Sequence, residues 1–322
     1  MKENILQIVA AVLLGLALPG LLIRLGPKAD FDVQTPETTA PTQPQTEETK
    51  TGIWVLGDDG QLQWMILDEY LTGVILAEMP TSYEHHALCA QAVVARTYAL
   101  KRQHDSRHPQ GAVCTDPACC QAHVEIGRYL NGLGFAQDVE AARSAVTETQ
   151  GMVVTYDGTL IEATYFHSSG GTTEEAVAVW GVDYPYLQVV SSPGEEKVED
   201  YSTEFRFTRT QLETMLGRSL PGPASGWLGK MTYTNGGGVA TILLAGIQYT
   251  GLQLRSMLKL NSTVFSVRAE QDGVVFTTRG RGHRVGMSQT GAQAMALQGN
   301  TWQEILSHYY PGTRIDKMEV VG

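Results

Sequence analysis

The sequence lacks features that mark several common classes of protein. Positive charge is scarce, with 23 Lys and Arg against 34 Asp and Glu and a net charge of −11. Non-specific nucleic-acid binding requires a positive field, so a DNA or RNA partner is disfavoured. Four cysteines among 322 residues are too few for a disulfide scaffold. No internal repeat interrupts the chain, and its 43% hydrophobic residues are enough to bury one large core or two modest ones.

Long apolar runs are also scarce, and the longest lies at the N-terminus. Residues 5–23 carry no charged side chain, and a helix of that length spans a hydrocarbon core of about 30 Å. The alternative is a cleaved signal peptide, but the run exceeds a usual h-region and no small-x-small motif follows before Arg24. We therefore expect a single transmembrane anchor within residues 1–25. The few flanking cations do not set its orientation.

The next segment, residues 26–52, is rich in Pro, Thr, Gln and Glu. Such a composition buries too little apolar surface to offset the entropy of ordering, so a disordered linker is predicted. The folded part is then residues 53–322.

Helices and strands are mixed in this folded part. Pro80 divides a short apolar helix over 67–79 from a longer helix over 84–102, whose apolar period ends in a cationic turn. Further helices are expected at 141–150, 251–258 and 288–298, and strands at 152–156, 160–165, 230–233, 239–244, 264–267 and 274–278. Without a regular βαβα alternation, this pattern predicts an α+β fold with two lobes facing a cleft.

Three segments carry the candidate chemistry. They are YLTGVILAEMPTSYEHHALCAQAVVARTYAL at 70–100, ATYFHSSGGTTEEAVAVWG at 163–181 and GRGHRVGMSQTGAQAMA at 280–296. Together they resemble the stage II sporulation protein D family, and the resemblance extends through 185–193, 254–267 and 305–313.

The resemblance implies a single-pass, membrane-anchored lytic transglycosylase. Such enzymes cut the MurNAc-β-1,4-GlcNAc bond of peptide-free peptidoglycan strands during engulfment in endospore formation. It also implies stage II sporulation proteins P and M as partners, and a globular part outside the cell membrane at the engulfing septum.

Glu78 in AEMP matches the catalytic acid of that family. Apolar neighbours surround it in the sequence, and burial would favour its neutral form, the form that protonates a glycosidic oxygen. Ordinary retaining or inverting hydrolases need two carboxyls, and no second carboxylate in the matching motifs is a comparable catalytic candidate. The competing interpretation is a surface glutamate at a helix end.

The other matching residues are candidates for glycan binding. Arg96 either orients a sugar group or Glu78, or forms a helix-packing salt bridge. The loop residues either contact sugar or only form tight turns: Tyr165, His167, Ser168, Ser169, His283, Ser288 and Gln289. Arg284 stands where relatives often have glycine, which predicts a stiffer loop or an extra cation facing the glycan.

A zinc site is expected in HPQGAVCTDPACC. His108, Cys114 and Cys120 stand at six-residue intervals, which resembles the His-Cys-Cys site of clostridial family members, and these ligands suit Zn²⁺. Cys119 is either a replacement for Cys120 or a fourth ligand, and His104 and His123 are further candidates. A disulfide or free thiols are the alternatives. Cys89 stands alone and is interpreted as a packed thiol.

Two other functions compete with the transglycosylase. Three protein ligands and an open position also fit a catalytic zinc, and hence a zinc-dependent wall hydrolase. Some relatives are described as enhancers of wall amidases, so a non-catalytic glycan-binding module is the second rival. The retention of Glu78 argues against the latter.

Overall fold

The computed structural model describes residues 51–105, 107–132, 134–198 and 201–318. The predicted anchor and nearly all of the predicted linker lie outside these residues. Within the described ranges, no helix is both long and apolar enough to cross a membrane.

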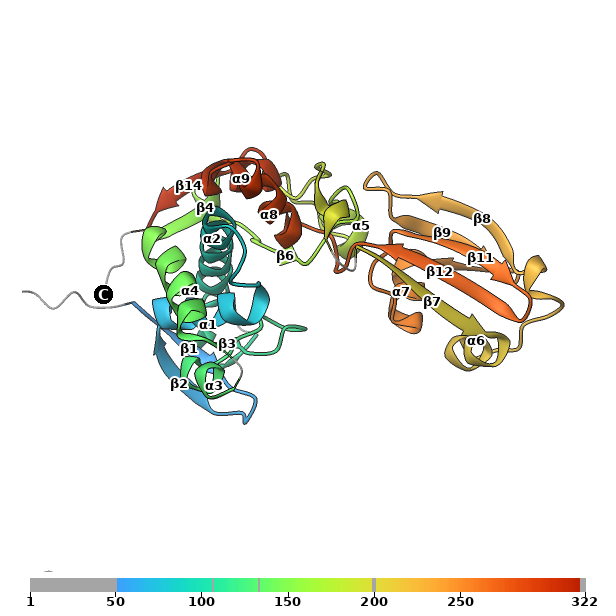
Figure 1. The fold of residues 1–322 in the computed structure, drawn as a ribbon, viewed down its shortest axis with the longest axis horizontal. Helices are drawn as coiled ribbons and strands as arrows, with labels where there is room; N and C mark the ends of the chain where they lie inside the picture. Colours follow the sequence, from blue (N-terminus) through green and yellow to red (C-terminus); the bar gives the residue numbers. More distant parts are fainter. Residues whose placement is uncertain (1–50, 106, 133, 199–200, 319–322) are drawn as a thin grey trace, which may run out of the picture. The chain divides into compact units, whose positions relative to one another are not determined.

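The fold is α+β (Figure 1), as the sequence predicts. The α-helices are α1 (Leu67–Glu78), α2 (His85–Arg102), α3 (Ile126–Asn131), α4 (Ala136–Glu148), α5 (Ala176–Trp180), α6 (Arg209–Leu216), α7 (Gly251–Leu258), α8 (Gln289–Leu297) and α9 (Trp302–Tyr309). Short 3-10 turns are η1 (Pro109–Gly111), η2 (Glu195–Lys197) and η3 (Ala224–Gly226).

The strands in the described part of the chain form five small sheets rather than one continuous layer. Three sheets have the orders β2-β1-β3, β14-β4-β5 and β13-β6, with strands β1 (Gly52–Leu56), β2 (Leu62–Ile66), β3 (Val113–Cys114), β4 (Met152–Tyr156), β5 (Thr159–Leu160), β6 (Tyr165–Phe166), β13 (Met287–Ser288) and β14 (Arg314–Lys317). Two sheets have the orders β10-β9-β8 and β11-β12-β7, with strands β7 (Ser202–Thr208), β8 (Leu228–Tyr233), β9 (Val239–Leu244), β10 (Ile247–Thr250), β11 (Phe265–Glu270) and β12 (Gly273–Arg279).

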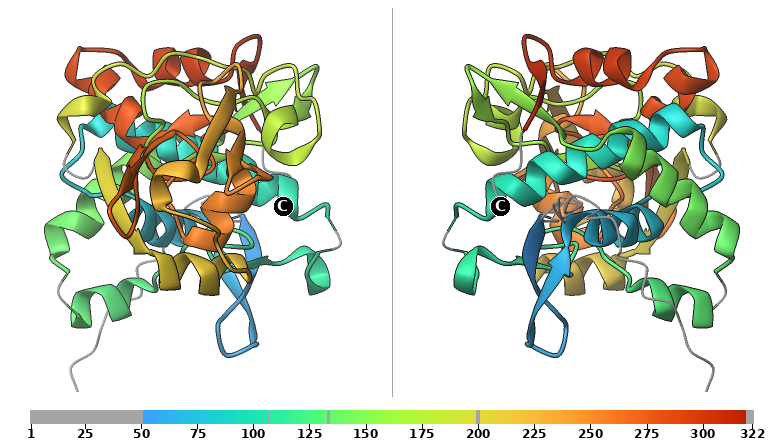
Figure 2. Two further views of the ribbon diagram at one scale, coloured as in Figure 1. Left: turned by 90° about the vertical axis from the view of Figure 1, so that its right-hand side faces the viewer. Right: turned by 90° about the vertical axis from the view of Figure 1, so that its left-hand side faces the viewer.

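The described residues build two hydrophobic cores. The first is centred on α2, which is buried along its length from Ala87 to Ala99 and packs against α1, α4, α8 and α9 (Figures 1 and 2). The many alanines of α2 let these neighbours approach closely. The second core lies among β7 to β12 with α6 and α7. In both helices a threonine and a glutamine form a capping box, which satisfies free N–H groups of the first turn.

Pro80 determines where α1 ends. The residue before a proline is driven into extended conformation, and Met79 has φ −133° and ψ 145°. Glu78 is therefore the last residue of α1, and its side chain is placed by the helix end.

Most predicted elements are present with shifted ends. α4 begins at Ala136 rather than 141, and the expected strand over 160–165 is interrupted, since β5 ends at Leu160 and β6 starts at Tyr165. The turn at Asp157 and Gly158 is confirmed, with φ of 49° and 73°, the left-handed values that a two-residue hairpin requires.

Candidate active site

Glu78 lines a large cavity. The cavity has a volume of about 1000 Å³. Residues from several segments border it: Glu78, Tyr98, 117–120, 164–167, Trp180, Tyr184 and 281–283. Arg255 on α7 and Leu260 and Asn261 in the following loop complete the lining described here. A second depression of about 640 Å³ shares Glu78 and is lined by Pro80, Tyr129, Phe135 and Asp138. Glu78 thus borders two adjoining hollows, the arrangement that an extended ligand requires.

The carboxyl of Glu78 is held by the loop that follows the cysteine cluster. Its Oε1 accepts a hydrogen bond of 2.8 Å from the backbone N–H of Ala122. Burial raises the pKa of Glu78 above its ordinary value, although the hydrogen bond from Ala122 and the polar groups of Tyr165 and Gln289 act in the opposite direction. The net effect favours the protonated acid.

Tyr165 and Gln289 stand beside this carboxyl. The hydroxyl of Tyr165 donates to Oε1 of Gln121 at 3.1 Å, and Gln121 is itself bonded to the hydroxyl of Tyr70. Gln289 begins α8 and is 4% exposed, and its Nε2 has no partner in hydrogen-bonding geometry among the described residues. The amide lies beside the carboxyl of Glu78, whose pKa it helps to lower, and it lines the cavity.

The two histidines of the matching loops also line the cavity. The ring of His283 packs between Phe166 and Trp180, at centroid distances of 5.6 Å and 5.2 Å. Burial, aided by the charge of Arg255, lowers the pKa of His283 to about 4. The imidazole is therefore neutral at pH 7, and its Nδ1 accepts from the N–H of Val285 at 3.1 Å. His167 borders both hollows.

The cavity is rich in cationic side chains although the chain is acidic overall. Arg102, Arg107, Arg255 and Arg281 all line it. Its second carboxylate among the described residues, Glu162, is ion-paired with Arg102 and lies 3.8 Å from Nζ of Lys101. The sequence interpretation missed these arginines because Arg102 and Arg107 are far in the sequence from Arg255 and Arg281.

Arg96 is the first candidate that the structure does not bring to the cavity. Its side chain is 2% exposed, and Nη1 donates to the carbonyl oxygens of Thr149 and Met152 at 2.7 Å and 3.2 Å, while Nη2 donates to Val146 at 3.1 Å. The expected sugar or Glu78 contact is thus wrong, because the guanidinium is used to satisfy carbonyls at the end of α4. The alternative, a helix-packing salt bridge, fits better, since Nη2 also lies 3.9 Å from a carboxylate oxygen of Asp68 on α1.

Three serines predicted to bind glycan are also buried elsewhere. Ser168 pairs through its backbone with Arg281. The hydroxyls of Ser169 and Ser288 both donate to the carboxylate of Glu195, which is fully buried and also accepts from Ser192, Thr290 and the N–H of Gly170. The predicted sugar contacts of Ser169 and Ser288 are wrong in this structure because their hydroxyls hold the two glycine-rich loops to Glu195. Glu195 was missed, since GEEK resembles an exposed charged turn.

Arg284 does not present a cation to the cavity. It is fully buried with φ 71°, donates through Nε to the carbonyl of Ser169 at 2.7 Å, and has Nη1 3.5 Å from a carboxylate oxygen of Glu174. Nη2 donates to the carbonyl oxygens of Thr172 and Gly236. The extra-cation expectation is therefore wrong, while these contacts are the kind that a stiffer loop would need.

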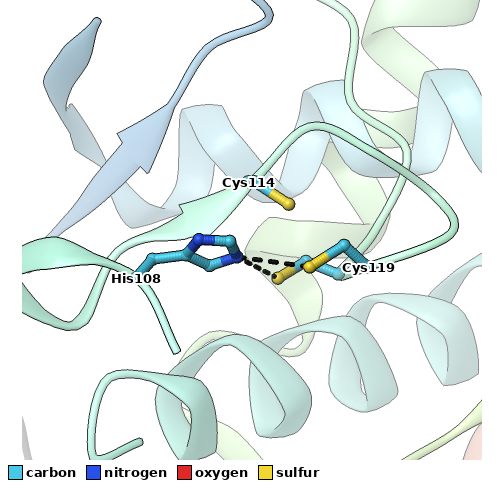
Figure 3. A group of neighbouring side chains, drawn as sticks. His108, Cys114 and Cys119 are labelled. Carbon is cyan, nitrogen blue, oxygen red and sulfur yellow. Dashed lines mark hydrogen bonds between the residues drawn. The ribbon is translucent and has the colours of Figure 1, made fainter. Parts of the chain in front are cut away.

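The predicted zinc ligands converge. One donor atom from each of His108, Cys114, Cys119 and Cys120 lies within 4.8 Å of the others, and Figure 3 shows the labelled side chains of His108, Cys114 and Cys119 gathered together. Nε2 of His108 is 3.3 Å from Sγ of Cys119 and 3.5 Å from Sγ of Cys120. All four cysteines of the chain are free thiols in the structure. His123 instead stacks on Tyr70, and neither it nor His104 belongs to this group.

These distances fit a tetrahedral metal. Zn–S and Zn–N bonds of ordinary length place nitrogen and sulfur ligands about 3.5 Å apart, close to both observed separations. A set of one imidazole and three thiols is also a common set for a closed structural zinc site. The donor set therefore fits the zinc that the resemblance implies, with Cys119 as the fourth ligand.

The cysteine loop is tied directly to the helix that carries Glu78. After Cys120, Nε2 of Gln121 donates to the carbonyl of Ala95 on α2, Ala122 donates to Glu78, and the N–H of Val124 donates to the carbonyl of Gly73 at 3.2 Å. A Cβ at Gly73 would lie 2.5 Å from Nε2 of His123 and from the carbonyl oxygen of Val124, so glycine permits the loop to approach α1.

Comparison with known proteins shows the family. The family model described as stage II sporulation protein matches residues 58–156. The stage II sporulation protein D of Bacillus subtilis (strain 168) is 32% identical over 99% of this chain and 97% of its own length. That of Bacillus amyloliquefaciens is 35% identical over 79% of this chain and 75% of its own. The chain belongs to the stage II sporulation protein D family.

A more distant relative has a different name. The amidase enhancer of Bacillus subtilis (strain 168) is 26% identical over 76% of this chain, but only 40% of its own length is covered.

Proposed function

We propose that this protein is a lytic transglycosylase that cleaves the MurNAc-β-1,4-GlcNAc bond of peptide-free peptidoglycan during engulfment in endospore formation. Family membership supports the role in sporulation. The observation that supports this reaction is that Glu78 lines a cavity and that burial raises the pKa of its carboxyl.

The neighbouring carboxylates are committed to other contacts. Glu162 is paired with two cations. Asp138 accepts from the hydroxyls of Thr81 and Tyr129 and from the N–H of Phe135, contacts that lower its pKa. Among the described residues lining the hollows, Glu78 is thus the carboxyl suited to act as an acid. A two-carboxylate hydrolase needs a second, free group, so the geometry favours a reaction with one.

Glu78 can serve both steps of such a reaction. The protonated carboxyl gives its proton to the glycosidic oxygen, and the C1–O4 bond breaks as the sugar gains oxocarbenium character. The resulting carboxylate then takes the proton of the muramic acid 6-hydroxyl, whose oxygen bonds to C1 and closes a 1,6-anhydro ring. The proton on Glu78 is restored, and no water is consumed.

The cavity chemistry suits a glycan without stem peptides. Removal of the peptide leaves a free lactyl carboxylate on each muramic acid, and Arg107 and Arg281 are exposed cations on the cavity wall. Trp180 and Tyr184 add aromatic surface for sugar rings. We infer that the two cores are the two predicted lobes and that the glycan lies between them.

We further propose a zinc ion on His108, Cys114, Cys119 and Cys120, with a structural role. Bound there, zinc would supply a cross-link within the loop that precedes Ala122. The acid chemistry of Glu78 requires no Lewis acid. In this proposal the N-terminal segment anchors the protein in the cell membrane, and the globular part lies outside the membrane. Stage II sporulation proteins P and M are its proposed partners.

Product analysis tests the reaction. Purified protein incubated with peptide-free glycan strands should release fragments with 1,6-anhydro ends, each lighter by one water than a hydrolytic fragment in mass spectrometry. Fragments with reducing ends alone would favour a hydrolase. Glycan binding without any cleavage would favour a non-catalytic role such as that of the amidase enhancer relative.

A further inference from the structure

A second group of metal-binding side chains lies at the start of α2. Nε2 of His85, Sγ of Cys89 and a carboxylate oxygen of Glu148 are all within 4.8 Å of one another. Nε2 is 2.6 Å from Oε2 of Glu148 and 3.5 Å from Sγ of Cys89. None of these three residues lines either hollow beside Glu78, so the group is separate from the candidate active site.

Regular secondary structure positions all three donors. His85 and Cys89 are four residues apart on α2 and therefore share one face of the helix. Glu148 is the last residue of α4, which packs along α2. Ligands carried on packed helices are better preorganised than ligands on loops.

An ordinary surface ion pair accounts poorly for this arrangement. The side chains of His85 and Glu148 are 43% and 44% exposed, and exposed pairs contribute little to stability. His85 begins α2 and Glu148 ends α4, so each would carry its charge at the helix end where the macrodipole disfavours it. Neither point explains why a fully buried thiol lies against both groups.

A cysteine nucleophile is also a poor explanation. Burial, reinforced by the negative charge of Glu148, raises the pKa of Cys89 to about 12. Reactive cysteines have the opposite property, since the thiolate is the nucleophile. A thiol next to a carboxylate and an imidazole ionises readily only when a cation replaces its proton.

We propose that His85, Cys89 and Glu148 form a second metal site for a divalent transition ion, with Zn²⁺ the best match. One imidazole, one thiolate and one carboxylate leave a fourth position for water, a ligand set compatible with tetrahedral zinc. The ion binds neutral His85 and ionised Glu148 and displaces the proton of Cys89, which passes to solvent.

The geometry requires only a small adjustment. The 3.5 Å between Nε2 and Sγ already equals the separation of about 3.5 Å expected of two zinc ligands. The 2.6 Å between Nε2 and Oε2 must widen to roughly 3.4 Å. Both partners of that shorter contact are half-exposed surface side chains that can move, whereas the buried sulfur stays in place. The bound ion joins the start of α2 to the end of α4.

Metal stoichiometry tests this site. Full-length protein is purified in detergent under reducing conditions, stripped with a chelator and titrated with Co²⁺, and bound metal is counted by elemental analysis. His85→Gln and Glu148→Gln should each bind about one equivalent less than wild type, and should lose the share of the sulfur-to-cobalt charge-transfer band that Cys89 contributes. Glu140→Gln, at an exposed position on the same helix as Glu148, should retain the wild-type stoichiometry.

The difference in metal count between wild type and variant does not depend on the first zinc site or on enzymatic activity. A cluster at His108 that bound nothing would lower every count equally, and the difference between wild type and His85→Gln would remain one equivalent. Because both substitutions are at half-exposed positions, they are compatible with folding. Equal stoichiometry in wild type and His85→Gln would overturn the proposal. His85, Cys89 and Glu148 would then be only hydrogen-bonded neighbours.

Discussion

The backbone N–H of Ala122 donates a 2.8 Å hydrogen bond to the carboxyl of Glu78. Ala122 follows Cys120 by two residues, so the loop that gathers the cysteines also holds the candidate acid. Between them, Gln121 bonds to Tyr70 on α1 and accepts from Tyr165 in the cavity. The cysteine cluster and the acid are therefore parts of one connected structure.

Loss of metal from the His108 cluster should consequently lower both stability and activity. His108→Ala is expected to bind about one equivalent less metal and to melt at a lower temperature, because metal-binding free energy adds to folding free energy. Cleavage should fall in parallel as the contact from Ala122 is lost. His104→Ala, an exposed histidine outside both clusters, should change neither property. An apoprotein with an unchanged melting temperature and no turnover would instead indicate a catalytic metal.

Replacement of the acid should abolish cleavage without unfolding the protein. Glu78→Gln keeps the shape of the side chain but cannot transfer a proton, and general acid catalysis is typically worth about 10² to 10⁴ in rate. Glycan binding should persist in a sedimentation assay. The matched control is Glu69→Gln, an exposed carboxyl on the same helix. Retention of more than about a tenth of wild-type cleavage would remove Glu78 from the catalytic role.

The raised pKa of Glu78 predicts a pH dependence with a defined sign. The folded protein holds this proton more tightly than the unfolded chain, where the pKa is near 4.5. The favourable contribution is complete below pH 4.5 and is lost as the pH rises through the folded-state pKa. Glu78→Gln should therefore be more stable than wild type at pH 7, and the difference should shrink at acid pH. Urea unfolding of both proteins across this range measures it, and a constant difference would contradict a raised pKa.

The rate of glycan cleavage should also depend on the protonation of Glu78. Since the acid must be protonated, kcat/KM should fall as the pH rises through the pKa of Glu78. A rate that increased over that range would indicate a carboxylate acting first as a base.

Arg96 should matter for stability rather than for substrate. Arg96→Met would remove the guanidinium hydrogen bonds to the carbonyl oxygens of Val146, Thr149 and Met152, at a cost of about 2–4 kcal/mol in the free energy of unfolding. KM and kcat of the folded fraction should be unchanged. Normal stability together with a raised KM would restore the sugar-binding interpretation.

The sequence was most informative where the signal is local. Pro80 separates α1 from α2, and the Asp157-Gly158 turn joins β4 to β5, because both depend on the backbone preferences of single residues. The spacing of His108, Cys114 and Cys120 likewise predicted side chains that do converge.

The errors concern residues whose role depends on distant partners. Ser169, Ser288 and Arg284 lie in loops that match the family, but their side chains are turned to Glu195 and Glu174 rather than to the cavity. Cys89 is a packed thiol, as interpreted, but its neighbour Glu148 could not be recognised from the sequence because it follows 59 residues later on another helix. A motif indicates which loops border a site, but not which of their side chains are needed to hold the loops together.

The cationic cavity wall predicts selectivity for glycan that carries free muramic acid carboxylates. Arg281→Gln should raise KM by up to about tenfold, since one charged hydrogen bond contributes roughly 1.5 kcal/mol. The kcat should change little, because among the described residues Arg281 makes no hydrogen bond or ion pair with Glu78. Its backbone pairing with Ser168 keeps the loop in place. Arg279→Gln, two residues away, exposed and outside the cavity lining, is the matched control. The difference between wild type and Arg281→Gln should disappear on glycan whose lactyl carboxylates have been reduced to alcohols, and an equal loss on both substrates would show that Arg281 recognises some other part of the strand.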